Sequence, residues 1–155
     1  MTSSLEHPVF PRLGEWCAQH EKNHDIALKI GPDGAFPGGD ILFLICCSDI
    51  IPATVRELYK HTLLVHASDL PEGRGWSPVI WQVLEGRNKI MVTLLEAEDK
   101  FDTGRIWLQK PIIMDGHELY DEINKKHHDS TLELMTEAVN RYSEITPRKQ
   151  VEEGA

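Results

Sequence analysis

The fold of this 155-residue chain is decided by residues 65–78, which read Val65-His66-Ala67-Ser68-Asp69-Leu70-Pro71-Glu72-Gly73-Arg74-Gly75-Trp76-Ser77-Pro78. The apolar run Thr62 to Val65 ends in His66, and a loop rich in Pro and Gly then leads into a helical pattern from Pro78 to Gly86. His66 is therefore expected at the carboxyl end of a strand. Ligand sites of open α/β sheets lie beyond such strand ends, so chemistry is expected at this histidine.

A second stretch, Phe101-Asp102-Thr103-Gly104-Arg105-Ile106, complements the first. Asp102 follows the strand-like run Lys89 to Leu95 and a short polar loop, and a parallel partner strand would bring it to the same sheet edge. We therefore expect His66 to act as a general acid or base, and Asp102 to orient the imidazole or keep it charged.

Strands alternate with helices along the chain, which predicts an α/β domain with a mostly parallel central sheet flanked by helices. The expected helices are Leu13 to His20, Pro52 to Lys60, Pro78 to Leu84, His117 to His127 and Ser130 to Tyr142, the last with Ser130 and Glu133 in a capping-box pattern. The expected strands are Asp25 to Ile30, Ile41 to Cys47, Thr62 to Val65, Lys89 to Leu95 and Ile106 to Ile113. Residues 1–145 are expected to form one domain, followed by a frayed polar tail at 146–155.

Composition excludes several classes of protein. The net charge of −9 and the lack of a Lys/Arg cluster argue against a nucleic-acid-binding surface. The longest apolar run, Ile41 to Cys47, is too short to cross a bilayer, and the first residues lack the pattern of a signal peptide, so a cytoplasmic protein is expected. Three cysteines, two of them adjacent in that apolar run, predict reduced and buried thiols.

The motifs around the site resemble those of a known family. The string HxSxLPxxRGxxP from His66, an apolar helix ending near a Gly, then VTL and DTGxI resemble the folate-dependent formyltransferases over roughly Gly39 to Gln109. The resemblance implies a Rossmann-like formyltransferase fold, here with the first strand shortened or absent. The segment SDLPEGRGWSP is most similar to the branch of the family that formylates amino sugars, including the pseudaminic-acid type.

This resemblance implies transfer of a formyl group from 10-formyltetrahydrofolate to an amine, without a metal. His66 and Asp102 match the catalytic histidine and aspartate of the family. The family asparagine two residues before the histidine is replaced by Leu64, which has no hydrogen-bond donor. Ser68, a backbone amide or a water would have to stabilise the oxyanion instead.

The resemblance also suggests where the ligands bind. The pterin would lie between two segments that supply mainly backbone groups, with Ile45, Cys47, Ser48, Ile50, Ala97, Glu98 and Asp99 as the cofactor-binding residues. The acceptor would meet Ser68, Arg74, Gly75 and Trp76. Trp76 could stack on a sugar or base, and Arg74 could reach an anionic group or form an ordinary loop salt bridge. Trp81, on a helical face, is expected in the core.

Other functions remain open at this point. The chain could be a folate- or nucleotide-binding homologue with weak or lost activity, or a formyltransferase for a purine precursor or an aminoacyl-tRNA. A homodimer is possible. His20-Glu21-Lys22-Asn23-His24 matches HExxH, but it falls at the polar end of a short helix, so zinc is not expected. The adjacent His127 and His128 are expected to be a solvated surface pair.

Overall fold

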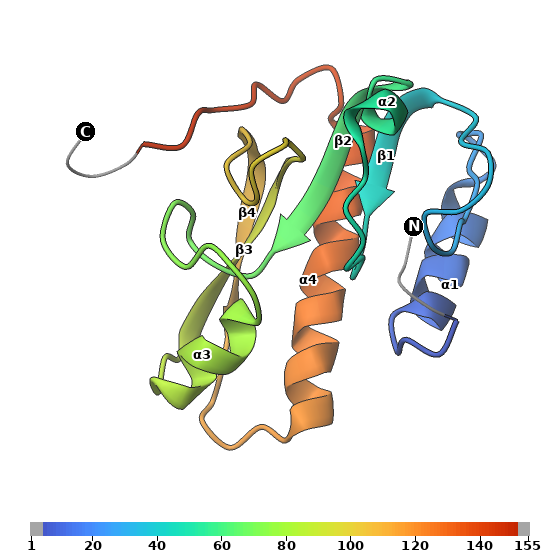
Figure 1. The fold of residues 1–155 in the computed structure, drawn as a ribbon. Coiled ribbons are helices and arrows are strands. Elements are labelled where there is room, and N and C mark those ends of the chain that lie inside the picture. Colours follow the sequence, from blue (N-terminus) through green and yellow to red (C-terminus); the bar gives the residue numbers. More distant parts are fainter. Residues whose placement is uncertain (1–4, 152–155) are drawn as a thin grey trace. The chain divides into compact units, whose positions relative to one another are not determined.

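The computed structural model describes residues 5–151 and contains four helices and four strands among them (Figure 1). The elements are α1 (Phe10–His20), β1 (Gly39–Leu44), α2 (Ala53–Arg56), β2 (Tyr59–His66), α3 (Pro78–Leu84), β3 (Lys89–Glu96), β4 (Ile106–Ile113) and α4 (Tyr120–Asn140). The strands are hydrogen-bonded in the order β1-β2-β3-β4. The chain divides after Thr62 into two compact units.

The first unit, up to Thr62, contains α1, β1, α2 and the start of β2. Pro11 lies in the first turn of α1, where a proline costs no helical hydrogen bond, and the helix buries Leu13 and Trp16. Leu42 of β1 and Ile51 form a small apolar core. This core is completed by half-buried side chains: Phe36, Leu44, Cys47, Val55 and Tyr59.

The second unit, from Leu63 onward, is an antiparallel arrangement of strands with one long helix. β2 pairs antiparallel with β3, from Leu63 opposite Glu96 to His66 opposite Thr93. β3 pairs antiparallel with β4, with a register shift between Leu94 and Leu95. β4 is the outer strand, which suits Pro111 because proline has no N–H to offer a further strand. α4 packs against β4 and β3.

The α/β class is confirmed, but the expected strand direction is wrong for the described pairings of β2, β3 and β4. Only residues 97–105 connect β3 to β4. A parallel pair needs a crossover of about a dozen residues or more, usually helical, so this connection is too short for one. The short spacing between these two strand patterns in the sequence already indicated an antiparallel pair.

Several expected elements also differ from those observed. Residues 25–29 have no regular structure, and the helix after Pro52 ends at Arg56. The two expected C-terminal helices are one, because Ser130 lies buried inside α4 instead of capping a new helix. The tail is not frayed at Arg148, whose backbone exchanges two hydrogen bonds with Ile106. Among residues 5–151, no helix has both the length and the hydropathy to span a bilayer.

Candidate active site

The structure brings His66 and Asp102 together within the second unit. His66 is the last residue of β2, and its Nδ1 lies 3.6 Å from Oδ1 of Asp102. Both side chains are largely buried, 8% and 12% exposed. The Nε2–H of His66 donates to the carbonyl oxygen of Gly73 at 2.8 Å, because that oxygen can only accept. Nδ1, on the opposite side of the ring, faces the Asp102 carboxylate.

Asp102 reaches the histidine through a loop, not through a parallel strand. It lies between β3 and β4 with a φ of 55°, a left-handed conformation that Asp tolerates better than most residues. Its Oδ2 accepts the N–H of Gly75 at 3.0 Å. A Cβ at Gly104 would overlap the carbonyl oxygen of Glu96, so the loop can pass this close to β3 only with glycine there. The motif DTG thus meets two backbone requirements: the left-handed conformation at Asp102 and the close approach of Gly104 to β3.

Two long side chains hold the same loop from outside. Arg74 donates from Nε to the carbonyl oxygen of Asp102 at 3.2 Å and from its terminal nitrogen to Oε1 of Gln150 at 2.7 Å. Gln150 donates from Nε2 to the carbonyl oxygens of Asp102 and Gly104 at 2.7 and 2.9 Å. Sequence reasoning missed Gln150, because no pattern in a polar tail indicates which loop it contacts.

Ser68 lies beside the histidine loop with an unsatisfied hydroxyl. The residue is 2% exposed, and its Oγ has no hydrogen-bond partner among the described residues. A Cβ at Gly73 would come within 2.9 Å of the Ser68 Cβ, so these two residues are closely packed. The Ser68 backbone oxygen accepts from Thr93 Oγ1, which in turn accepts from Gln109 at 2.9 Å. Gln109 is a second polar contributor that sequence reasoning missed.

Leu64, where the family has asparagine, belongs to an apolar cluster. It packs as a partly buried side chain against Leu70, Leu95 and Ile106, all of them buried. Leu64 therefore contributes to the packing beneath the loop and supplies no polar group.

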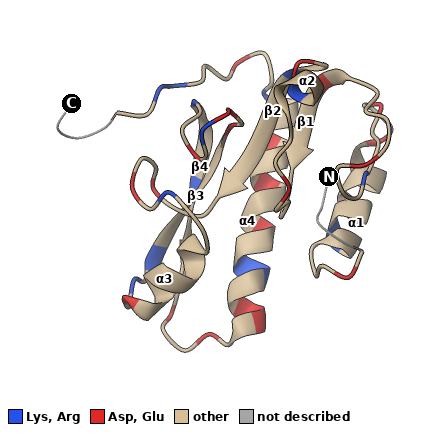
Figure 2. Cartoon of the chain, in the orientation of Figure 1, with Lys and Arg blue, Asp and Glu red and all other residues tan. Residues whose placement is uncertain are grey.

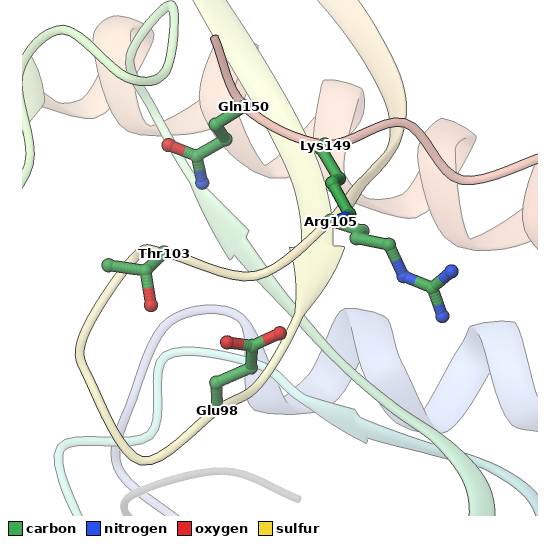
Figure 3. A pocket seen from close by; sticks show the side chains of 5 residues that line it. All are labelled: Glu98, Thr103, Arg105, Lys149 and Gln150. Carbon is green, nitrogen blue, oxygen red and sulfur yellow. The ribbon is translucent and has the colours of Figure 1, made fainter. Parts of the chain in front are cut away.

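The residues expected to bind the cofactor fall into both units. Ile45, Cys47, Ser48 and Ile50 belong to the first unit, and Ala97, Glu98 and Asp99 to the second. Glu98 lines an open pocket of about 400 Å³, with Thr103, Arg105, Lys149 and Gln150 (Figure 3). The walls of this pocket are polar and charged, unlike the apolar slot expected for a pterin. Folate binding by the seven residues stays a prediction.

Trp76, in the loop after His66, and Trp81, in α3, are both exposed. Trp76 is 74% exposed, and Gly75 beside it directs its N–H at Asp102. Trp81 of α3 is 63% exposed, so the expectation that it lies in the core is wrong. α3 buries none of its residues fully, which explains the error: an apolar helical face need not be covered by its own domain. The stacking role of Trp76 stays a prediction, as does acceptor binding by Arg74.

The HExxH match from His20 to His24 does not lie on a single helix. α1 ends at His20, which stacks on Trp16, so His24 lies beyond the helix.

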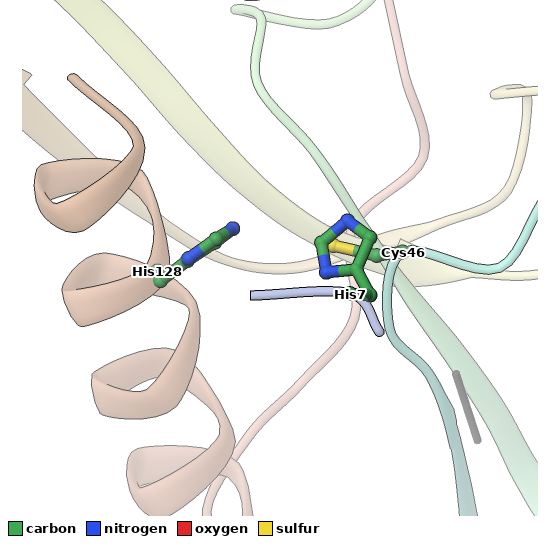
Figure 4. A group of neighbouring side chains, drawn as sticks. All are labelled: His7, Cys46 and His128. Carbon is green, nitrogen blue, oxygen red and sulfur yellow. The ribbon is translucent and has the colours of Figure 1, made fainter. Parts of the chain in front are cut away.

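His128 is 6% exposed on α4, so the expectation that His127 and His128 form a solvated surface pair is wrong for His128. In the first unit, burial raises the pKa of the Cys46 thiol to about 11, and His7 lies beside it (Figure 4).

Comparison with known proteins agrees with this fold and these motifs. Residues 19–139 match the formyl transferase family, and the chain belongs to that family. Methionyl-tRNA formyltransferase from Caldicellulosiruptor saccharolyticus is 27% identical over 132 residues, which is 84% of this chain and 40% of that protein. The chain thus spans well under half the length of the curated relatives it matches.

Solved structures show the same fold. A protein from Mycobacterium tuberculosis, described as a candidate sugar N-formyltransferase, superposes with a TM-score of 0.69 at 21% identity, covering 89% of this chain and 66% of that one. HypX from Aquifex aeolicus, solved in complex with tetrahydrofolic acid, superposes with a TM-score of 0.63 at 26% identity, covering 73% and 20%. Both superpositions cover most of this chain and show that its fold recurs in these proteins.

Proposed function

We propose that this chain carries the catalytic part of an N-formyltransferase that uses 10-formyltetrahydrofolate and formylates the amine of an amino sugar, either nucleotide-linked or a nonulosonate precursor. The observation that carries the proposal is the buried pair of His66 and Asp102, 3.6 Å apart on motif loops of the family. The cofactor supplies the formyl group, as the relative solved with tetrahydrofolic acid suggests. No metal is needed for this chemistry.

Formyl transfer from the donor nitrogen to the acceptor amine involves no change of oxidation state, so it needs no oxidant or reductant. A bond forms between the acceptor nitrogen and the formyl carbon, and the bond from that carbon to the donor nitrogen breaks. The proton that the amine loses ends on the donor nitrogen. His66 would donate a hydrogen bond from Nε2 to the oxygen on which negative charge develops, and for this it must exchange its present acceptor, the Gly73 carbonyl. Asp102 orients the ring and can accept the amine proton through water.

Four observations favour an amino sugar as the acceptor. The stretch from Ser68 to Pro78 resembles the amino-sugar branch, and one structural neighbour is described as a candidate sugar N-formyltransferase. Trp76 is exposed beside the site, where it can stack on a sugar or a base. The net charge of −9 disfavours a polyanionic acceptor. A cytoplasmic location and a homodimer remain predictions.

Two other functions have specific support. The curated relatives are methionyl-tRNA formyltransferases, which favours an aminoacyl-tRNA acceptor. Leu64 favours a homologue that binds folate with weak or lost activity, because the asparagine donor is absent. Turnover assays on amino sugars and on methionyl-tRNA, with calorimetry of folate binding, separate the three functions. Saturable folate binding without turnover on either amine supports the homologue with lost activity.

The first prediction tests the catalytic pair. His66→Ala and Asp102→Asn should each lower turnover by about 100-fold or more, because each removes a general acid/base or its orienting carboxylate. Asn tolerates the left-handed backbone of residue 102, so the fold should survive. Formyl transfer is followed by release of tetrahydrofolate, and folding by circular dichroism.

His117→Ala and Asp121→Asn are the matched controls, since both side chains are exposed outside the site. These variants should keep the activity of the unmodified chain. Unchanged turnover in both His66→Ala and Asp102→Asn would remove the assignment.

A further inference from the structure

The side chain of Gln150 is tied to the loop that carries Asp102. Its amide nitrogen donates to two backbone carbonyls of that loop, those of Asp102 and Gly104, at 2.7 and 2.9 Å. Its amide oxygen accepts from Arg74 at 2.7 Å. Both N–H groups of the amide are thus used, and both end on the DTG turn.

The tail that bears Gln150 is itself held in place. Arg148 and Ile106 exchange backbone hydrogen bonds of 2.8 and 2.9 Å, which places the tail along the open edge of β4. Two residues later the half-buried side chain of Gln150 reaches the loop. The tail is therefore an extra edge segment that spans from β4 to the turn.

The turn needs such external support. Asp102 has a φ of 55°, a left-handed conformation that is unfavourable for most residues with a Cβ and that Asp adopts more readily than most. No strand or helix includes residues 97–105, and the local support within this loop is a turn in which Thr103 Oγ1 donates to the carbonyl oxygen of Lys100 at 2.8 Å, so no ladder of strand or helix hydrogen bonds holds Asp102. Gln150 and Arg74 both donate to the Asp102 carbonyl, and they thereby hold the main chain from which the carboxylate projects.

We infer that Gln150 is a positioning residue: it holds the main chain of Asp102 so that the carboxylate faces His66 and accepts the Gly75 N–H. The catalytic value of this positioning rests on the proposed formyl transfer. The geometric part does not, because the Asp102 to Gly75 hydrogen bond exists whatever reaction the site performs.

Two substitutions at Gln150 test the inference in the full chain. Gln150→Met keeps the length of the side chain and removes all three hydrogen bonds. Gln150→Glu keeps an acceptor for Arg74, but it loses both donors and sets a carboxylate against two carbonyls. Val151→Ala is the control, since Val151 is 76% exposed at the next position.

Amide hydrogen exchange at Gly75 is the readout that does not depend on activity. Both Gln150 variants should speed this exchange by about tenfold or more, with Gln150→Glu at least as fast as Gln150→Met, while Val151→Ala matches the unmodified chain. In the formyl transfer assay kcat should fall by about 10- to 100-fold with KM within about twofold, as misplacement of a reacting group predicts.

Gly75 exchange at the unmodified rate in either Gln150 variant would overturn the inference. If the unmodified chain shows no formyl transfer, the proposed function fails, and Gly75 exchange still decides the positioning role. Suppose that the unmodified chain transfers formyl groups and that His66→Ala and Asp102→Asn lose this activity. If the Gln150 variants then keep the full kcat, the proposed function stands and the positioning role is wrong.

Discussion

Gly73 shows how one residue constrains the geometry of the histidine. Its φ is 70°, and a Cβ there would lie 2.9 Å from the Cβ of Ser68. Both facts require glycine, and its carbonyl then faces Nε2 of His66 at 2.8 Å. The histidine is held from one side by this carbonyl and faces a carboxylate on the other. Any ligand of Nε2 must replace the Gly73 carbonyl.

The prediction at the residue scale concerns Leu64. Leu64→Asn should lower stability by about 1–3 kcal/mol, because it places an amide among Leu70, Leu95 and Ile106. The same amide restores the donor that the family has at this position. We expect turnover at least about tenfold above that of Leu64→Ala, as one oxyanion donor implies. Thermal unfolding and the formyl transfer assay measure the two effects.

Leu64→Ala separates the donor from the loss of packing. It removes the same apolar contacts without adding a polar group. Equal turnover in the two variants would show that residue 64 does not face the reacting oxygen.

At the scale of elements, the register shift between β3 and β4 decides which side chains lie at the start of the loop 97–105 that carries Asp102. Leu94 pairs with Leu108 and Leu95 with Ile106, so Trp107 is the extra residue. Its indole N–H donates to Glu96 at 3.2 Å, and Arg105 pairs with the other oxygen of that carboxylate. Such bulges increase strand twist next to functional sites. The loop 97–105 therefore starts from a fixed pair of strand ends.

The prediction for an element concerns the start of α4. Lys126 holds the pKa of the Glu118 carboxyl well below its usual range, with further help from the N–H groups of Asp115 and Gly116. A folded pKa below the unfolded one stabilises the protein above the ordinary pKa of 4.5. This stabilisation is lost as pH falls through the folded value. Thermal unfolding between pH 7 and pH 2 should show it.

Glu118→Gln is the control for this pH dependence. It cannot ionise, so its unfolding temperature should fall less steeply below pH 4.5 than that of the unmodified chain. Parallel curves for the two proteins would contradict the role of this ion pair.

At the scale of the whole molecule, charge bears on the choice of acceptor. Lys and Arg are interspersed with Asp and Glu along the elements (Figure 2), and the total is −9. A protein that neutralises phosphates needs clustered cations, and its affinity falls steeply with salt. An amino sugar lacks this requirement, because one stacking surface and a few polar groups can bind it.

The prediction at this scale compares two acceptors. Formyl transfer to a nucleotide-linked 4-amino sugar should change less than about threefold between 50 and 200 mM salt, while any transfer to methionyl-tRNA should be weak and fall steeply. Filter binding of tRNA at both salt concentrations is the companion measurement. Efficient transfer to methionyl-tRNA at 200 mM salt would favour the tRNA function over the amino sugar.

The sequence alone determined the features that depend on neighbouring residues. It predicted α3 at the observed Pro78 to Leu84 and β4 at Ile106 to Ile113, because apolar periodicity and Pro or Gly boundaries act locally. It also singled out His66 and Asp102 as a pair, through motifs of a family to which the chain belongs. Their catalytic roles stay predictions.

Only the tertiary structure decided which segments meet. The antiparallel pairing of β2, β3 and β4, the burial of Ser130 within α4 and the exposure of Trp81 depend on contacts between distant residues. The same holds for Gln150, which reaches Asp102 across 48 positions of sequence. A local pattern specifies what a segment can become, whereas its partner is chosen by the burial and hydrogen bonding of the whole fold.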